Sequence, residues 1–151
     1  MRKVLPIITI LAVLAGAAPL FADLDGLWEG EGKGVCYPPF PTPSIHPIYA
    51  WQKWSGYVEN KEVFYGKWAD ERGNFGQFEG KILPLSPSDK YVVCEGRWTW
   101  FNTLVKPPKE ITMGKFTMNF YYNEDVCEGK WWSDYSPSVK PGIMKGKRVG
   151  D

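Results

Sequence analysis

A short motif, Gly-x-Trp, recurs four times along this chain and constrains its fold more than any other feature. One copy lies in Val93-Cys94-Glu95-Gly96-Arg97-Trp98, which returns almost unchanged as Val126-Cys127-Glu128-Gly129-Lys130-Trp131. The other copies are Gly26-Leu27-Trp28 and Gly66-Lys67-Trp68. Each copy is paired with a second run that carries a glycine of its own, at Gly56, Gly80, Gly114 and Gly146. The pattern predicts four related hairpins.

Runs rich in Val, Phe, Tyr, Trp and Thr alternate with clusters of Gly, Pro, Asn and Asp, which is typical of an all-β chain. We expect eight strands, at residues 24–30, 49–59, 63–70, 76–84, 91–101, 110–122, 126–135 and 142–149. The strand count and the repeat predict an eight-stranded antiparallel up-and-down barrel built from four repeated hairpins. A two-sheet β-sandwich is the alternative.

Side chains two residues apart on a strand point to the same face of a sheet. This alternation puts the Gly and Trp of each motif on one apolar face and the charged side chains on the other. Inward glycines either let a strand bend for closure or make room for a neighbouring indole. Five further aromatic residues are expected on the outer face: Trp51, Tyr57, Tyr65, Tyr121 and Trp132.

Residues 1–22 have the pattern of a secretory signal peptide. A positively charged start is followed by an apolar run over residues 4–14 and by small side chains. We expect cleavage after Ala22, with Ala15-Gly16-Ala17 as a competing site and an uncleaved anchor as the alternative. Residues 23–151 then form a single all-β domain, and the predicted location is secreted or periplasmic.

Composition excludes some classes of partner. The chain carries 18 Lys and Arg against 17 Asp and Glu, mixed along the predicted strands, so nucleic acid is not an expected partner. Charges in the middle of strands disfavour an outer-membrane barrel. Beyond the signal peptide, no membrane contact is expected.

The side chains that most catalytic and metal sites require are scarce. His46 is the only histidine, which excludes a multi-histidine zinc site within one chain. Glu95 and Glu128 occupy equivalent places on the polar face, where cross-strand pairing with cations is favoured over paired-carboxylate hydrolysis. We predict no catalytic residue, no metal site and no cofactor.

Three cysteines in an oxidising destination predict one disulfide and one free thiol, with three unpaired core thiols as the alternative. Cys94 and Cys127 fall on predicted strands two apart, which are separated by about 9.5 Å. That exceeds the roughly 7 Å Cα limit for a bridge. Cys36, in a loop, could reach either of them.

A long connection from Glu31 to Ile48 carries five prolines, with aromatic residues among and beside them. Such a loop is stiff, and long loops in compact domains often bind ligands. We expect it to cover one barrel end, either as a binding element or as a plug. The candidate ligand contacts are Tyr37, Phe40, Trp51 and Trp54 at the loop and rim, with Trp100 as the pocket floor.

Gly26-Leu27-Trp28 resembles the Gly-x-Trp that opens the first strand of lipocalins and avidins, the calycin barrels. The resemblance covers this strand and the strand count. It implies a barrel that binds a small, often apolar ligand at its mouth. The three further copies of Gly-x-Trp depart from that family's pattern, so no ligand contact is carried over.

These observations favour a non-enzymatic binding module that holds a small apolar ligand or a carbohydrate at an open barrel end. The first alternative is a cell-envelope domain with a filled core that binds another protein or has a structural role. The second alternative is a hydrolase that uses two carboxylates.

Overall fold

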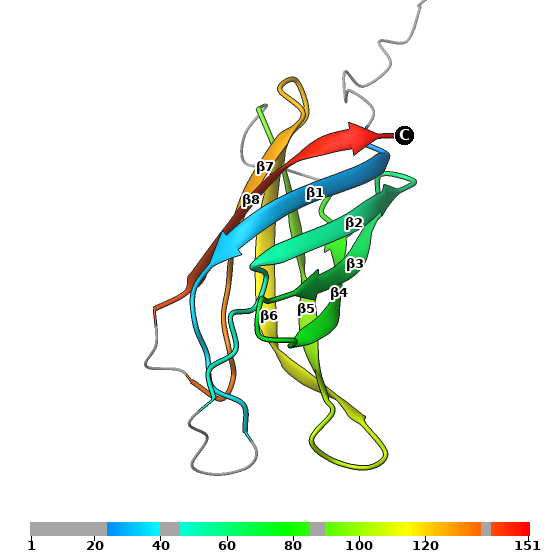
Figure 1. The fold of residues 1–151 in the computed structure, drawn as a ribbon. Coiled ribbons are helices and arrows are strands. Elements are labelled where there is room, and N and C mark those ends of the chain that lie inside the picture. Colours follow the sequence, from blue (N-terminus) through cyan, green and yellow to red (C-terminus); the bar gives the residue numbers. More distant parts are fainter. Residues whose placement is uncertain (1–23, 40–45, 85–89, 137–139) are drawn as a thin grey trace, which may run out of the picture.

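The computed structural model describes residues 24–39, 46–84, 90–136 and 140–151 (Figure 1). The strands are β1 (Gly26–Lys33), β2 (Lys53–Glu59), β3 (Val63–Ala69), β4 (Phe75–Ile82), β5 (Val92–Asn102), β6 (Lys109–Tyr121), β7 (Val126–Trp131) and β8 (Gly142–Gly150). The predicted signal peptide lies outside the described residues. The described part is all-β, and within it no helix is long and apolar enough to cross a membrane.

The eight strands follow one another in chain order around a closed barrel, each antiparallel to its neighbours. β1 pairs with β8 to complete the barrel, with Leu27 opposite Gly150 at one end of the ladder and Lys33 opposite Ile143 at the other. This confirms the predicted up-and-down barrel, and the sandwich alternative is not needed. The largest differences in strand bounds are that β2 begins at Lys53 rather than at 49 and β7 ends at Trp131 rather than at 135.

The fourfold repeat has a direct structural meaning. In every hairpin the tryptophan of Gly-x-Trp faces a glycine on the next strand, and the glycine of the motif faces a larger apolar residue. The facing pairs are Trp28 with Gly56, Trp68 with Gly76, Trp98 with Gly114, and Trp131 with Gly142. Gly80 and Gly146 lie on β4 and β8, as expected, but the glycines that face the tryptophans there are Gly76 and Gly142, because spacing along the chain does not fix the pairing register.

These glycines make room for aromatic rings. A Cβ added at Gly56 would lie 2.8 Å from ring atoms of both Phe64 and Phe78, closer than real Cβ contacts come. At Gly76 it would lie 2.7 Å from Trp68 Nε1, which donates a hydrogen bond to the Thr99 carbonyl oxygen (2.9 Å). The second of the two roles expected for inward glycines is thus present in the core.

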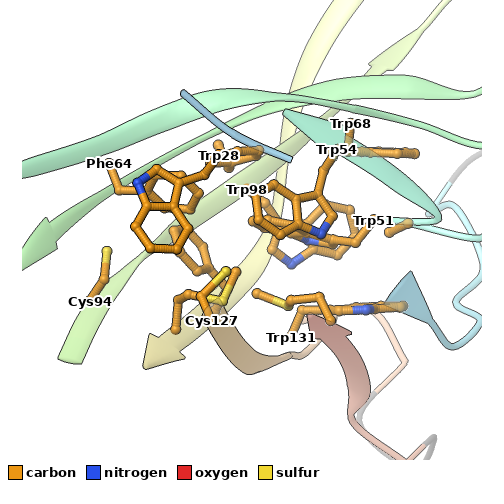
Figure 2. Close-up of a cluster of buried hydrophobic side chains, with 14 of the residues drawn as sticks. Trp28, Trp51, Trp54, Phe64, Trp68, Cys94, Trp98, Cys127 and Trp131 are labelled. Atoms are coloured by element: carbon orange, nitrogen blue, oxygen red, sulfur yellow. The ribbon is translucent and has the colours of Figure 1, made fainter. Parts of the chain in front are cut away.

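Aromatic rings occupy the inside of the barrel (Figure 2). Ring centroids are 4.4 Å apart for Trp51 and Phe78, 4.8 Å for Phe78 and Phe64, and 5.1 Å for Phe64 and Phe120. Trp28 continues the series, at 4.9 Å from Phe120. Edge-on and offset contacts of this kind stabilise a core beyond the apolar area they bury.

Trp51 is fully buried, so its predicted place on the outer face is wrong. It lies in the turn that precedes β2 and has a φ of 62°. The alternation rule holds only within a strand. The positive φ turns the ring inward, where it stacks on Phe78 with an interplanar angle of 22°.

The described parts of the β1–β2 connection pack against the barrel end where β1 finishes and β2 begins. The Cys36 N–H donates to the Ile48 carbonyl (2.9 Å) and the Ile48 N–H donates to the Cys36 carbonyl (2.8 Å), which ties the two arms of the loop together. Asp70, after β3, accepts from the Tyr49 N–H (3.1 Å). Since Cys36 and Ile48 are buried along with Trp51, this connection contributes part of the core.

Gly76→Ala should lower the free energy of unfolding by about 3 kcal/mol, because its Cβ would overlap the Thr99 carbonyl oxygen and crowd the Trp68 Nε1 that donates to this oxygen. Chemical denaturation followed by tryptophan fluorescence measures this. Gly150→Ala is the matched control, since an added Cβ there meets nothing within 4 Å. Equal stability of the two variants would contradict the proposed packing.

Candidate functional site

Two open grooves lie on the outer face of the barrel. We call the first the tyrosine groove; it has a volume of about 880 Å³, and Tyr57, Tyr65, Gln77, Glu79, Glu95 and Arg97 are among its lining residues. The second, the lysine groove, has a volume of about 1120 Å³, and Glu29, Lys53, Phe75, Val126, Glu128 and Lys145 are among its lining residues. The tyrosine groove crosses β2 to β5, and the lysine groove lies mainly over β7, β8 and β1 to β3.

The tyrosine groove carries a pair of stacked aromatic rings. Tyr57 on β2 faces Tyr65 on β3, with ring centroids 6.4 Å apart and planes inclined by 29°. Tyr57 is 46% exposed and Tyr65 is 40% exposed. Tyr65 faces Glu79, and Glu79 faces Arg97, so the pair begins a continuous outer row across four strands.

Charges in the tyrosine groove balance. Three cationic and three anionic side chains line it: Lys67, Lys81 and Arg97, with Glu79, Glu95 and Glu110. Ser55, Gln77 and Thr99 add neutral donors and acceptors. The groove therefore offers hydrogen bonds in both directions without a net charge.

Several of these side chains are held in place by neighbours. The Thr99 hydroxyl donates to Glu110 Oε1 (2.9 Å) and accepts from the Gln77 backbone N–H (3.1 Å). Arg97 Nη2 pairs with Asp134 Oδ2 at 2.6 Å. Fixed side chains lose less conformational freedom when a ligand binds, which favours affinity.

The lysine groove has an ordered pattern of opposite charges. Glu128 faces Lys145, Lys145 faces Glu31 on its other side, and Glu31 faces Lys53. The Tyr121 hydroxyl donates to Glu128 Oε1 (2.8 Å), and this hydrogen bond is the main cause of a raised pKa of Tyr121. Opposite charges thus alternate along this row, as on many exposed sheets.

The carboxylates singled out in the sequence do not meet. Glu95 lines the tyrosine groove, whereas Glu128 lines the lysine groove. A two-carboxylate hydrolase built on this pair has no shared cleft. Among the described residues, no group of three His, Cys, Asp or Glu side chains lies close enough to hold a metal ion.

The structure separates the expected ligand contacts. Tyr37 is exposed in the β1–β2 connection, while Trp51, Trp54 and Trp100 are all buried in the core. Phe40 lies outside the described residues. The three tryptophans pack in the core, and Trp54 also lines the lysine groove. Ligand contact by the five residues stays a prediction.

Sequence reasoning placed Tyr57 and Tyr65 on the outer face but did not identify them as a site. A signal was available, because only three residues separate the predicted strands 49–59 and 63–70, which indicates a tight turn between them. A hairpin closed there puts Tyr57 and Tyr65 opposite each other.

All three cysteines are free and buried, so the expected disulfide is wrong. Cys94 on β5 and Cys127 on β7 are separated by β6, as the predicted strand order required. Burial is the main cause of the raised thiol pKa values, with that of Cys36 reaching about 12 and those of Cys94 and Cys127 also raised. The three cysteines are therefore unreactive thiols that pack in the core.

Comparison with protein-family models, with curated proteins and with solved structures found no match. The function is therefore inferred from the side chains and grooves of this chain.

The buried thiols predict a loss of stability in alkali. Their folded pKa values lie above the ordinary value of 9.0, so the unfolded chain loses these protons first as pH rises. Stability is full below about pH 9 and falls above it, by up to about 1.4 kcal/mol per pH unit for each thiol. Urea unfolding from about pH 8 to about pH 11 measures the slope.

Cys94→Ala is the control for this pH dependence. Its unfolding free energy should fall less steeply with pH than that of the unaltered chain, by the contribution of one thiol. Identical slopes would show that Cys94 titrates alike in the folded and unfolded states, against the expected effect of burial.

Proposed function

We propose that this protein is a non-enzymatic binding module that holds a carbohydrate chain in the tyrosine groove. The observation that carries the proposal is the exposed, stacked pair of Tyr57 and Tyr65 beside a charge-balanced row of donors and acceptors. The groove crosses the strands β2 to β5. This length can hold several sugar units side by side.

A carbohydrate suits this groove chemically. One face of a sugar ring carries C–H groups that pack on an aromatic ring, and its hydroxyls both donate and accept hydrogen bonds. Glu79 and Arg97 supply an acceptor and a donor in the row next to Tyr65. Equal numbers of acidic and basic side chains favour a neutral ligand over an ion.

The packed interior favours a binding site on the outer face over the site expected at the barrel mouth. Trp51 and Trp54 lie within a series of ring contacts, and Trp51 comes from the β1–β2 connection, which contributes part of the core. A small apolar ligand would have to displace these rings. The resemblance of Gly26-Leu27-Trp28 to the first strand of calycin barrels, and the binding function that it implies, stay a prediction.

The predicted signal peptide supports a location outside the cell or in the periplasm, where extracellular and envelope glycans are found. A protein partner in the cell envelope is the second candidate. It is favoured by the lysine groove, where Phe75 and Val126 expose apolar side chains.

Tyr57→Ala and Tyr65→Ala should each weaken carbohydrate binding roughly tenfold, because each removes one ring from the stack. A glycan array identifies the ligand, and calorimetric titration with the best oligosaccharide measures the change. Tyr135→Ala is the matched control, since this exposed tyrosine lines neither groove.

Full binding by a Tyr57→Ala and Tyr65→Ala double variant would contradict the proposed site. Failure of the unaltered chain to bind any glycan would contradict the carbohydrate proposal and favour a protein partner. Far-ultraviolet circular dichroism of each variant checks that the barrel is intact.

A further inference from the structure

The β5–β6 hairpin forms an arm that extends past the rest of the barrel. The last residue of β5 that pairs with β4 is Trp98, opposite Phe78. Beyond it, β5 and β6 pair with each other through further rungs that end with Asn102 opposite Lys109. Figure 1 shows this hairpin reaching beyond the neighbouring strands at one end of the molecule.

The tip of this arm is apolar and exposed. Leu104 is 67% exposed and Val105 is 37% exposed, and both lie in the short loop between β5 and β6. Pro107 and Pro108 follow, also exposed. Leu104 is the most exposed of the large apolar side chains described, so the arm carries its apolar surface where contact with another body is easiest.

The loop is held in shape. Asn102 is buried, and its Oδ1 accepts a hydrogen bond from the Leu104 N–H (3.0 Å). At the base of the arm, Phe101 stacks on Phe75 with centroids 5.4 Å apart and planes inclined by 20°. The exposed aliphatic side chains are therefore carried by an ordered loop. Little conformational entropy is lost when this loop docks.

The charged side chains of the loop and of its last rung are of one sign. Lys106 and Lys109 are exposed and flank the two prolines. No Asp or Glu occurs from Gly96 to Lys109, and the next carboxylate, Glu110, accepts a hydrogen bond from Thr99. Apolar side chains at a protruding tip with lysines beside them match the boundary between anionic headgroups and acyl chains.

We propose that this tip docks onto an anionic lipid bilayer. Leu104 and Val105 enter the boundary between headgroups and acyl chains, while Lys106 and Lys109 pair with lipid phosphates. The contact is weak and reversible, since two aliphatic side chains and two cations provide far less attraction than a spanning segment. This proposal departs from the expectation that only the signal peptide meets a membrane, and it is independent of the tyrosine groove.

A lipid surface fits the tip better than a protein partner does. A stable protein interface buries about 800 Å² on each side, which needs many more residues than one short loop provides. A bilayer needs no matching pocket, so a short loop with two apolar side chains can insert into it. The flanking lysines give it a preference for anionic lipid.

Co-sedimentation of the purified chain with vesicles tests the proposal. Vesicles of phosphatidylcholine alone are compared with vesicles of phosphatidylcholine and phosphatidylglycerol at roughly three to one. The unaltered chain should bind the anionic vesicles and release from them as salt rises. Leu104→Asn with Val105→Asn, and separately Lys106→Glu with Lys109→Glu, should each weaken binding roughly tenfold or more.

Matched controls lie away from the arm. Val149→Asn replaces an exposed aliphatic side chain on β8, and Lys61→Glu reverses a charge in the β2–β3 turn. Both should bind as the unaltered chain does, as should the Tyr57→Ala and Tyr65→Ala double variant. That last result separates this proposal from the carbohydrate site.

Three outcomes would overturn the docking proposal: no binding of the unaltered chain to anionic vesicles, unchanged binding by the tip variants, or equal losses in the controls. Tip-dependent self-association without vesicles, measured by sedimentation velocity, would also overturn it and assign the tip to a second copy of the chain.

Discussion

The whole barrel depends on aromatic rings packed directly against bare backbone. In each of the four hairpins a tryptophan faces a glycine on the next strand, so an indole lies where two side chains would otherwise compete. The arrangement also lets indoles reach past a strand. Trp68 on β3 donates over β4 to the Thr99 carbonyl on β5, and Trp98 on β5 donates over β6 to the Trp132 carbonyl just after β7. These buried donors are thereby satisfied, and strands two apart are tied together.

Gly56 and three other inward glycines connect the core to the outer surface. Gly56, Gly66, Gly80 and Gly96 make room for rings on the inside, and their backbone lines the tyrosine groove on the outside. A single peptide layer thus separates the packed rings from the proposed ligand. Any change that pushes the sheet outward would alter the groove together with the core.

Much of the fold could be predicted because it depends on local patterns. Period-two alternation, glycine-rich punctuation and the repeated motif were sufficient for strand number, order and facing. The inward position of Trp51 was not predicted because Trp51 lies outside a strand, where the alternation of side chains does not apply. The pairing of Trp68 with Gly76 and of Trp131 with Gly142 was not predicted, because the strand register depends on turns and on packing as well as on spacing along the chain.

The candidate site was less accessible to sequence reasoning. The pairing of Tyr57 with Tyr65 follows from one tight turn, but the groove beside them depends on how several strands curve together. The separation of Cys94 from Cys127 followed from the predicted strand order, but no sequence pattern fixed the place of Cys36 in its loop, where it stays unpaired. The protruding arm could not be predicted either. It exists because the last residues of β5 pair with β6 but not with β4, and this depends on how the strands are staggered in the closed sheet.

The pairing of β1 with β8 has a consequence for how this molecule forms. Until the last strand arrives, β1 and β7 each present an unpaired edge, which is a site for wrong association. Closure joins the most distant parts of the chain, so it belongs to the slow class of folding steps. Because Leu27 lies opposite Gly150, the two ends of the described chain are neighbours. A circularly permuted chain, joined there and opened at the β2–β3 turn, would keep every rung of the barrel while changing which strand closes it last.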